Sequence, residues 1–185
     1  MANRVANPDF ESNTNGWVAI GGATIARITS DKHSGNACMD VLTGTDWLGV
    51  ACPQVETGNF QNQLFRFSAW FKAATSGDIG KSISMIVISV PSGTQDGFDV
   101  TLTADWVQHH FTYTWPDVTT EYRFDIRANN PNATRFYVDD VFIDLDALDN
   151  CLPDADVTTT GWTTTPLYSK VNDVSDSTVI QATAA

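Results

Sequence analysis

Basic residues are scarce in this chain of 185 residues: Lys and Arg total 10 against 22 Asp and Glu, which gives a formal net charge of −12. Nucleic-acid binding depends on clusters of basic side chains, and the sequence contains no such cluster. Long apolar runs are also absent. The longest, residues 83–90, is interrupted by serines and is far shorter than the roughly 20 residues of a membrane-spanning helix. We therefore expect neither a nucleic-acid nor a membrane partner.

Cysteine is rare and irregularly placed. Cys38, Cys52 and Cys151 are an odd number at long spacings, which fits neither a disulfide framework nor a tetrahedral zinc site. We expect all three to be reduced or incidental, and Cys38 with Cys52 is the one pair to inspect for a bond.

Motifs of catalysis are missing as well. There is no Gly-x-Ser-x-Gly, phosphate loop or Cys-x-x-Cys, and no carboxylate pair is singled out by spacing as in a glycosidase. His109 and His110 are adjacent in an extended segment, so they point to opposite faces and cannot act together on a metal. The sequence therefore predicts a protein that is not an enzyme.

Amphipathic helices are not indicated, because no stretch of a dozen residues keeps a helical apolar spacing. Apolar and polar residues alternate instead, most clearly in 64–72, 107–115 and 122–128, and we expect the last two runs to form adjacent antiparallel strands. Shorter strands, separated by glycine-containing turns, are expected at 17–20, 24–28, 37–42, 48–55, 82–90 and 98–102.

This pattern predicts an all-β fold, a two-sheet antiparallel β-sandwich of the jelly-roll type. One core is expected between the sheets. Its predicted members are Phe65, Phe67, Ala69, Phe71, Phe111, Tyr113, Phe124, Ile126 and Phe136, with Trp17 and Trp106 also placed in the core.

The last expected strand changes phase near its middle. Phe136 and Val138 are in phase with each other but not with Val141, so the pattern slips by one residue at Asp139 and Asp140. A β-bulge inserts one extra residue and redirects the side chains beside it. We predict a bulge here that redirects both carboxylates.

The composition changes after residue 148, where Thr, Ser and Asp dominate and large apolar residues are few. Such a segment cannot bury a core of its own. The predicted organisation is a jelly-roll domain at 1–148 followed by an extended C-terminal arm at 149–185.

Six short motifs occur in an order typical of one family. They are Asn-Pro-Asp-Phe-Glu at 7–11, Asn-Gly-Trp at 15–17, His-Ser-Gly at 33–35, Leu-Phe-Arg-Phe-Ser-Ala-Trp-Phe-Lys at 64–72, Asp-Trp at 105–106 and Phe-Tyr-Val-Asp-Asp-Val at 136–141. Together, over about residues 5–146, they resemble the carbohydrate-binding modules of the family 4, 9 and 22 type. The resemblance implies a non-catalytic jelly roll, often with a structural calcium ion and a sugar-binding face or cleft lined by aromatic residues. It bears on the fold more than on the ligand.

By this resemblance, Glu11 and Asp139 are candidate calcium ligands, with backbone carbonyls and Asp31 completing the shell. Calcium takes six to eight oxygen ligands, and a cation would neutralise neighbouring carboxylates in an acidic protein. The alternative is that these carboxylates are solvated at the end of a strand.

Trp47 and Trp70 are candidates for stacking on a sugar, because an indole packs against the apolar C–H face of a pyranose. Trp47 lies in an expected loop, and Trp70 lies on the outer face of an expected strand. Asp46, Gln54 and Arg66 are the expected polar companions. The alternative is that the two tryptophans pack under loops or against another subunit.

The arm has a second resemblance, to a segment that recurs in bacteriophage virion proteins. The motifs are Pro-Asp-Ala-Asp-Val at 153–157, Gly-Trp at 161–162, Leu-Tyr at 167–168, Asn-Asp at 172–173 and Thr-Val-Ile at 178–180. In those proteins the segment usually opens another β-domain, whereas here the sequence stops, which favours an intermolecular role. The predicted anchors on a partner are Trp162, Leu167, Tyr168, Val179 and Ile180.

Two functions remain. The first is a non-catalytic virion surface protein, such as a phage capsid decoration or cement protein, that self-associates or docks on other virion subunits through its arm. The alternative is an extracellular carbohydrate-binding module for polysaccharide or cell-surface glycan. The N-terminus lacks the apolar stretch of a secretory signal, and a virion component leaves the cell by lysis. We therefore expect a homo-oligomer at the virion surface, with carbohydrate binding as the alternative.

Overall fold

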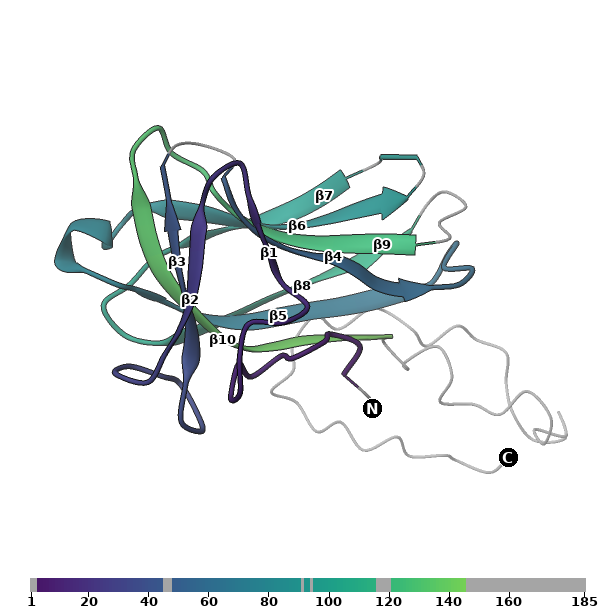
Figure 1. Ribbon diagram of the computed structural model, residues 1–185. Coiled ribbons are helices and arrows are strands. Elements are labelled where there is room, and N and C mark those ends of the chain that lie inside the picture. Colours follow the sequence, from purple (N-terminus) through teal and green to yellow (C-terminus); the bar gives the residue numbers. More distant parts are fainter. Residues whose placement is uncertain (1–2, 45–47, 91, 94, 116–120, 146–185) are drawn as a thin grey trace, which may run out of the picture. The chain divides into compact units, whose positions relative to one another are not determined.

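The computed structural model describes residues 3–44, 48–90, 92–93, 95–115 and 121–145 (Figure 1). This part of the chain contains ten strands and one short 3₁₀ helix, η1 (Ser76–Asp78). The strands are β1 (Val18–Ile20), β2 (Thr24–Ile28), β3 (Cys38–Thr43), β4 (Gly49–Thr57), β5 (Leu64–Ala73), β6 (Ser82–Val90), β7 (Gln95–Thr101), β8 (Val107–Thr114), β9 (Glu121–Ala128) and β10 (Thr134–Leu145).

The strands form two five-stranded sheets that face each other (Figure 1). Sheet A has the order β1-β4-β9-β6-β7, and sheet B has the order β2-β3-β10-β5-β8. Every pairing is antiparallel. The predicted all-β sandwich is confirmed, because apolar residues from both sheets pack together in one core.

One expected pairing is wrong. The runs at 107–115 and 122–128 do form strands, but β8 belongs to sheet B and β9 to sheet A, so the chain crosses between sheets there. Period-two burial indicates which side of a strand faces the core. It does not indicate which sheet the strand joins.

The core between the sheets is rich in aromatic rings. The Phe67 ring lies 4.9 Å from that of Phe111 in its own sheet and 5.9 Å from that of Phe124 in the opposite sheet, measured between centroids. All nine predicted core residues belong to this cluster, with Phe111 and Tyr113 at its partly buried margin. Trp17 is buried as expected.

Trp106 corrects the sequence prediction, because it is half-buried outside this core. It precedes β8, and its indole Nε1–H donates a hydrogen bond to Asp31 at 3.0 Å. A tryptophan with a polar partner for its N–H is stable at such a boundary.

The predicted bulge is present in β10. Its register with β5 shifts between Asp139 and Phe142, and Asp140 has a φ of +46°, in the left-handed region. The extra residue lets Val138 and Val141 both face the core. It also leaves Asp139 buried at the point where the register changes.

The chain divides into two units, Met1–Asp146 and Ala147–Ala185. The arm predicted at 149–185, including its five anchor residues, lies outside the residues that the structure describes. None of the described helical residues forms a segment long and apolar enough to cross a membrane.

Replacing Phe67 with Ala should lower the free energy of unfolding by roughly 3 to 5 kcal/mol, because it removes a ring that touches both sheets. Chemical denaturation of the variant and the wild type measures this difference. Gln108→Ala, at an exposed position of β8, is the matched surface control and should change stability little. Unchanged stability of the Phe67 variant would contradict the proposed role of this core.

Candidate functional site

The outer face of sheet A carries a row of charged side chains on β9. Tyr122 and Phe124 point into the core, so the alternate residues Arg123, Asp125 and Arg127 point away from it. We call these three residues the Arg–Asp–Arg trio.

Asp125 is fully buried although it lies on an outer face, with 0% of its surface exposed. Its Oδ2 accepts a hydrogen bond from Nη2 of Arg123 at 2.9 Å and another from Nη2 of Arg127. The other oxygen, Oδ1, is buried with no hydrogen-bond partner among the described residues, and so are the Nε–H groups of both arginines. Buried polar atoms without partners cost free energy, so the trio marks a place where an incoming polar group would be favourable.

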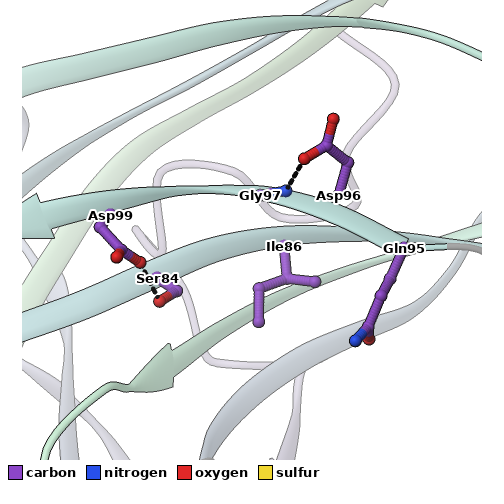
Figure 2. A pocket seen from close by; sticks show the side chains of 6 residues that line it. All are labelled: Ser84, Ile86, Gln95, Asp96, Gly97 and Asp99. Carbon is purple, nitrogen blue, oxygen red and sulfur yellow. Dashed lines mark hydrogen bonds between the residues drawn. The ribbon is translucent and has the colours of Figure 1, made fainter.

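A shallow hollow of about 270 Å³ lies on strands β6 and β7 of the same sheet (Figure 2). It is lined by Ser84, Ile86, Gln95, Asp96, Gly97 and Asp99.

The strand register places the hollow beside the trio. Asp125 on β9 is opposite Ile86 on β6, and Ile86 is opposite Gly97 on β7. One row away, Arg127 is opposite Ser84. Cross-strand partners project on the same side of a sheet, so the trio and the lining residues share one face.

The hollow contains further hydrogen-bonding groups. Ser84 Oγ donates to Asp99 Oδ1 at 2.5 Å, and the Gly97 N–H donates to Asp96 Oδ1 at 2.7 Å (Figure 2). Gly97 keeps β7 close to β6, because a Cβ there would lie 2.7 Å from the carbonyl oxygen of Met85. The missing side chain at Gly97 also leaves the space that the hollow occupies.

The outer face of sheet B is built differently, around Trp70. The His33 ring stacks on Trp70 with a centroid distance of 3.6 Å and an interplanar angle of 15°. Nδ1 of His33 lies 2.7 Å from Oδ2 of Asp140, which fixes the orientation of the imidazole. One face of the Trp70 indole is therefore already occupied by a side chain of the protein.

The residues predicted to bind sugar are divided between the two sheets. Trp70 and Arg66 lie on β5 in sheet B, whereas Gln54 lies on β4 in sheet A. Trp47, Asp46 and the side chain of Gln54 lie outside what the structure describes. The described residues therefore do not bring the predicted set together on one face.

The predicted calcium ligands Glu11 and Asp139 both bind the loop at 33–37. Oε1 of Glu11 accepts the N–H of Asn36 at 2.7 Å, and this hydrogen bond is the main reason why the pKa of Glu11 is lowered. A Cβ on Gly35, whose φ is +57°, would lie 2.0 Å from the same oxygen. The glycine of the His-Ser-Gly motif is therefore needed for close approach of the carboxylate.

Asp139 holds the start of this loop. Its Oδ2 accepts the N–H groups of His33 at 3.0 Å and Ser34 at 3.2 Å, and its Oδ1 accepts the N–H of Asp140 at 2.9 Å. Burial raises the pKa of Asp139 to about 6, and the negative charge of Asp140 adds to this, although the three N–H donors act in the opposite direction.

Asp31 has other partners. Its carboxylate pairs with Nζ of Lys72 at 2.6 Å and with the indole of Trp106. Burial alone would raise the pKa of Asp31, but these two hydrogen bonds lower it overall.

Residues 2–134 match the family model CBM_4_9, a carbohydrate binding domain. The chain belongs to this family. The match covers most of sheets A and B, and it supports the carbohydrate-binding part of the resemblance seen in the sequence.

Solved carbohydrate-binding domains share the fold at low sequence identity. The CBM22-1 xylan-binding domain of Paenibacillus barcinonensis Xyn10C is 17% identical, covers 74% of this chain and 90% of its own, and gives a TM-score of 0.60. The C-terminal family 22 module of Clostridium thermocellum Xyn10B is 20% identical, with coverages of 75% and 90% and a TM-score of 0.60. TmCBM61, solved with β-1,4-galactotriose, is 16% identical, with coverages of 79% and 100% and a TM-score of 0.59. The comparison with curated proteins gives no significant match.

Some functional features of this family member could not be assigned from the sequence. The alternation on β9 already placed Arg123, Asp125 and Arg127 on an outer face, but not as a site. The sequence did offer one signal: the chain has only ten basic residues, and two of them flank one acid on a single face of this strand.

Among the described residues, no group of three His, Cys, Asp or Glu side chains is placed to hold a metal ion. Asp31 does not join the other two carboxylates, and a cation shared by Glu11 and Asp139 stays a prediction.

Chelation tests that prediction. If the folded protein binds calcium at Glu11 and Asp139, added calcium should raise the melting temperature and a chelator should lower it, because a ligand of the native state stabilises it by mass action. The double variant Glu11→Gln, Asp139→Asn should lose the response. Superimposable melting curves for the wild type with calcium and with chelator would exclude a structural calcium ion.

The raised pKa of Asp139 gives a second prediction, which is measured with a chelator present so that no calcium is bound. An unfolded Asp titrates near pH 3.9, whereas Asp139 in the folded protein titrates at about 6, so the folded state binds the proton more tightly. The free energy of unfolding should therefore fall as pH rises from about 4 to about 6, by on the order of 2 kcal/mol. Asp139→Asn should remove this fall, whereas Asp105→Asn, at an exposed position, should retain it. A wild-type profile that matches that of Asp139→Asn across this range would contradict the assignment.

Proposed function

We propose that this chain is a non-catalytic module that binds glycan on the outer face of sheet A, at the Arg–Asp–Arg trio and the adjoining hollow. The observation that carries the proposal is the buried carboxylate Asp125, which lies between two arginines. Among the described residues, one of its oxygens is paired, whereas the other oxygen and the Nε–H groups of both arginines have no partner. Membership in a family of carbohydrate-binding domains supports the same function.

The chemistry of the trio suits a sugar. Each hydroxyl of a sugar both donates and accepts a hydrogen bond, so a hydroxyl can accept from the guanidinium of Arg123, whose side chain is 36% exposed. Asp125 Oδ1 and the buried Nε–H groups come within reach of a hydroxyl when the arginine side chains move aside on binding. Hydrogen bonds that involve charged groups are stronger than those between neutral groups. The apolar side chain of Ile86, beside Asp125 in the register, provides a surface for the C–H groups of the ring.

The charge of the protein favours an uncharged glycan. Asp96 and Asp99 line the hollow, and the whole chain carries a formal net charge of −12. These charges repel a polyanion such as a uronic acid polymer, most strongly at low salt.

The comparisons favour the alternative of the two functions expected from the sequence. They support carbohydrate binding, and with it an extracellular site of action, whereas the virion role receives no support from them. Docking on virion subunits through the arm stays a prediction about residues outside the described part. Family membership also supports a non-catalytic role.

Binding to a panel of neutral and anionic polysaccharides, measured by affinity electrophoresis and calorimetry, tests the proposal. Asp125→Asn and Arg127→Ala should weaken binding of the preferred neutral glycan by about 10- to 100-fold, because each removes hydrogen bonds to a charged group. Arg66→Ala, an arginine change on sheet B, is the matched control and should bind normally.

Two results would contradict the site. Normal binding by Asp125→Asn and Arg127→Ala, together with lost binding by Trp70→Ala or Arg66→Ala, would move the site to sheet B. An absence of binding by the wild type to every glycan tested would reject glycan binding itself.

A further inference from the structure

The outer edge of strand β8 is a second feature that lacks a partner within the described part of the chain. β8 is the last strand of sheet B and pairs on one side with β5, in continuous register from Leu64 opposite Thr114 to Phe71 opposite Val107. On its other side, no segment of the described chain forms a backbone hydrogen bond with it. Figure 1 shows β8 beside β5.

The hydrogen bonds of Trp115, the residue after β8, show which backbone groups of β8 point to the open edge. The N–H of Trp115 donates to the carbonyl of Gln63, and its carbonyl accepts from the N–H of Asn62, so both groups of Trp115 are directed toward the segment that leads into β5. Backbone groups in a strand alternate in direction with period two. Gln108, His110, Thr112 and Thr114 therefore direct their N–H and C=O groups to the open edge.

This edge lacks the protection that edge strands normally carry. Proteins block unwanted pairing with charged residues, proline, bulges or very short edge strands. β8 reads Val-Gln-His-His-Phe-Thr-Tyr-Thr, with no Lys, Arg, Asp, Glu or Pro, and its register contains no bulge. Residues with high β-propensity make up most of the strand.

The other three edges of the two sheets differ from β8 in this respect. β7 carries Asp96 and Asp99, and β1 is only three residues long. β2 contains Arg27, whose guanidinium binds the carbonyl oxygens of Phe10 and Glu11. Of these four edges, β8 is the long one without a formal charge.

Exposed apolar surface lies at the same edge. Val107 on β8 is 36% exposed, and Phe98 on β7 is 41% exposed. The Phe98 ring lies 6.2 Å from the ring of His109, so the two residues flank the open side of the sandwich together. Apolar residues at an unpaired edge indicate a surface that is covered by a partner.

We propose that β8 pairs antiparallel with β8 of a second copy of this chain, on a two-fold axis at Phe111. This register pairs all four outward-directed residues, with Gln108 opposite Thr114 and His110 opposite Thr112 in each half. The side chains on the core side then pair Phe111 with Phe111 and His109 with Tyr113. These are aromatic and polar pairs of the kind that stabilise neighbouring strands, and no like charges oppose each other at neutral pH.

A second copy fits this edge better than a charged partner does. The chain carries a formal net charge of −12, so two copies repel each other over most of their surface, whereas β8 adds no charge to the contact. Salt screens the remaining repulsion within about 10 Å at 0.1 M. Dimerisation should therefore become stronger as salt is added.

The dimer has a consequence that rests on the function proposed above. Because core-side residues pair with core-side residues, the two B sheets join into one continuous sheet, and both A sheets lie on the same side of it. The two hollows then face the same way. A long glycan or a glycan-coated surface could engage both, which raises the apparent affinity without any new contact.

Sedimentation equilibrium of the full chain tests the dimer directly. The wild type should dimerise, and Thr112→Lys should weaken the dimer at least tenfold, because lysine on an edge strand prevents pairing. Thr112→Pro should do the same by removing an outward N–H, which an edge strand tolerates. Thr101→Lys, the same change at an exposed position of the β7 edge, is the matched control and should leave the dimer intact. Circular dichroism shows that each variant is folded.

Hydrogen exchange tests the register. The amides of His110 and Thr112 should exchange more slowly as protein concentration rises, whereas those of β7 should not change. A wild type that stays monomeric at its highest soluble concentration would overturn the proposal. A dimer that Thr112→Lys leaves intact, or that only Trp162→Ala disrupts, would overturn it as well by assigning association to another surface.

Glycan binding separates this inference from the proposed function. Thr112→Lys should retain the affinity of the wild type for a short oligosaccharide and bind an insoluble polymer about 100-fold more weakly. A dimer that binds no glycan would refute the proposed function and leave the β8 contact standing. If the monomeric Thr112→Lys variant and the dimeric wild type bound the polymer equally well, the idea that one glycan engages both hollows of the dimer would be refuted.

Discussion

The packing of aromatic rings between the two sheets determines the rest of this molecule. Phe67 contacts Phe111 beside it and Phe124 across the core, so β5, β8 and β9 are held with one defined face inward. A shift of one residue in any of these strands would turn its apolar set toward water. The same constraint holds Arg123 and Asp125 on the outer face of sheet A, where the glycan site is proposed.

Much of the fold could be predicted from the sequence, because alternation of apolar residues reports burial directly. β2 and β6 occupy the predicted residues, and the slip at Asp139 and Asp140 is a true bulge. The partners of the strands could not be predicted in the same way. Tyr113 on β8 and Tyr122 on β9 alternate in the same manner but lie in different sheets. Sheet membership depends on the path of the connection and on long-range packing, which a period of two does not encode.

The candidate site was harder to predict than the core, because it depends on which side chains meet across strands. Arg127 meets Ser84, and Asp125 meets Ile86, only through pairing of β9 with β6, two strands far apart in the chain. An exposed tryptophan was the more obvious signal in the sequence. At Trp70 that signal led to a ring already stacked on His33, a contact between residues whose proximity only the bulge and the loop at 33–37 create.

Two fully buried aspartates, Asp139 and Asp125, differ in how completely their oxygens are paired. Asp139 has 0% exposure, and each of its oxygens accepts at least one backbone N–H, so it holds the loop at 33–37. Asp125 is equally buried, yet one oxygen is paired twice and the other has no partner in the described chain. Burial without full pairing costs stability, and a fold tolerates that cost where a bound molecule restores the missing hydrogen bonds. The pairing of its oxygens, more than its burial or charge, therefore distinguishes Asp125 from Asp139, and it is the basis on which we propose a glycan site there.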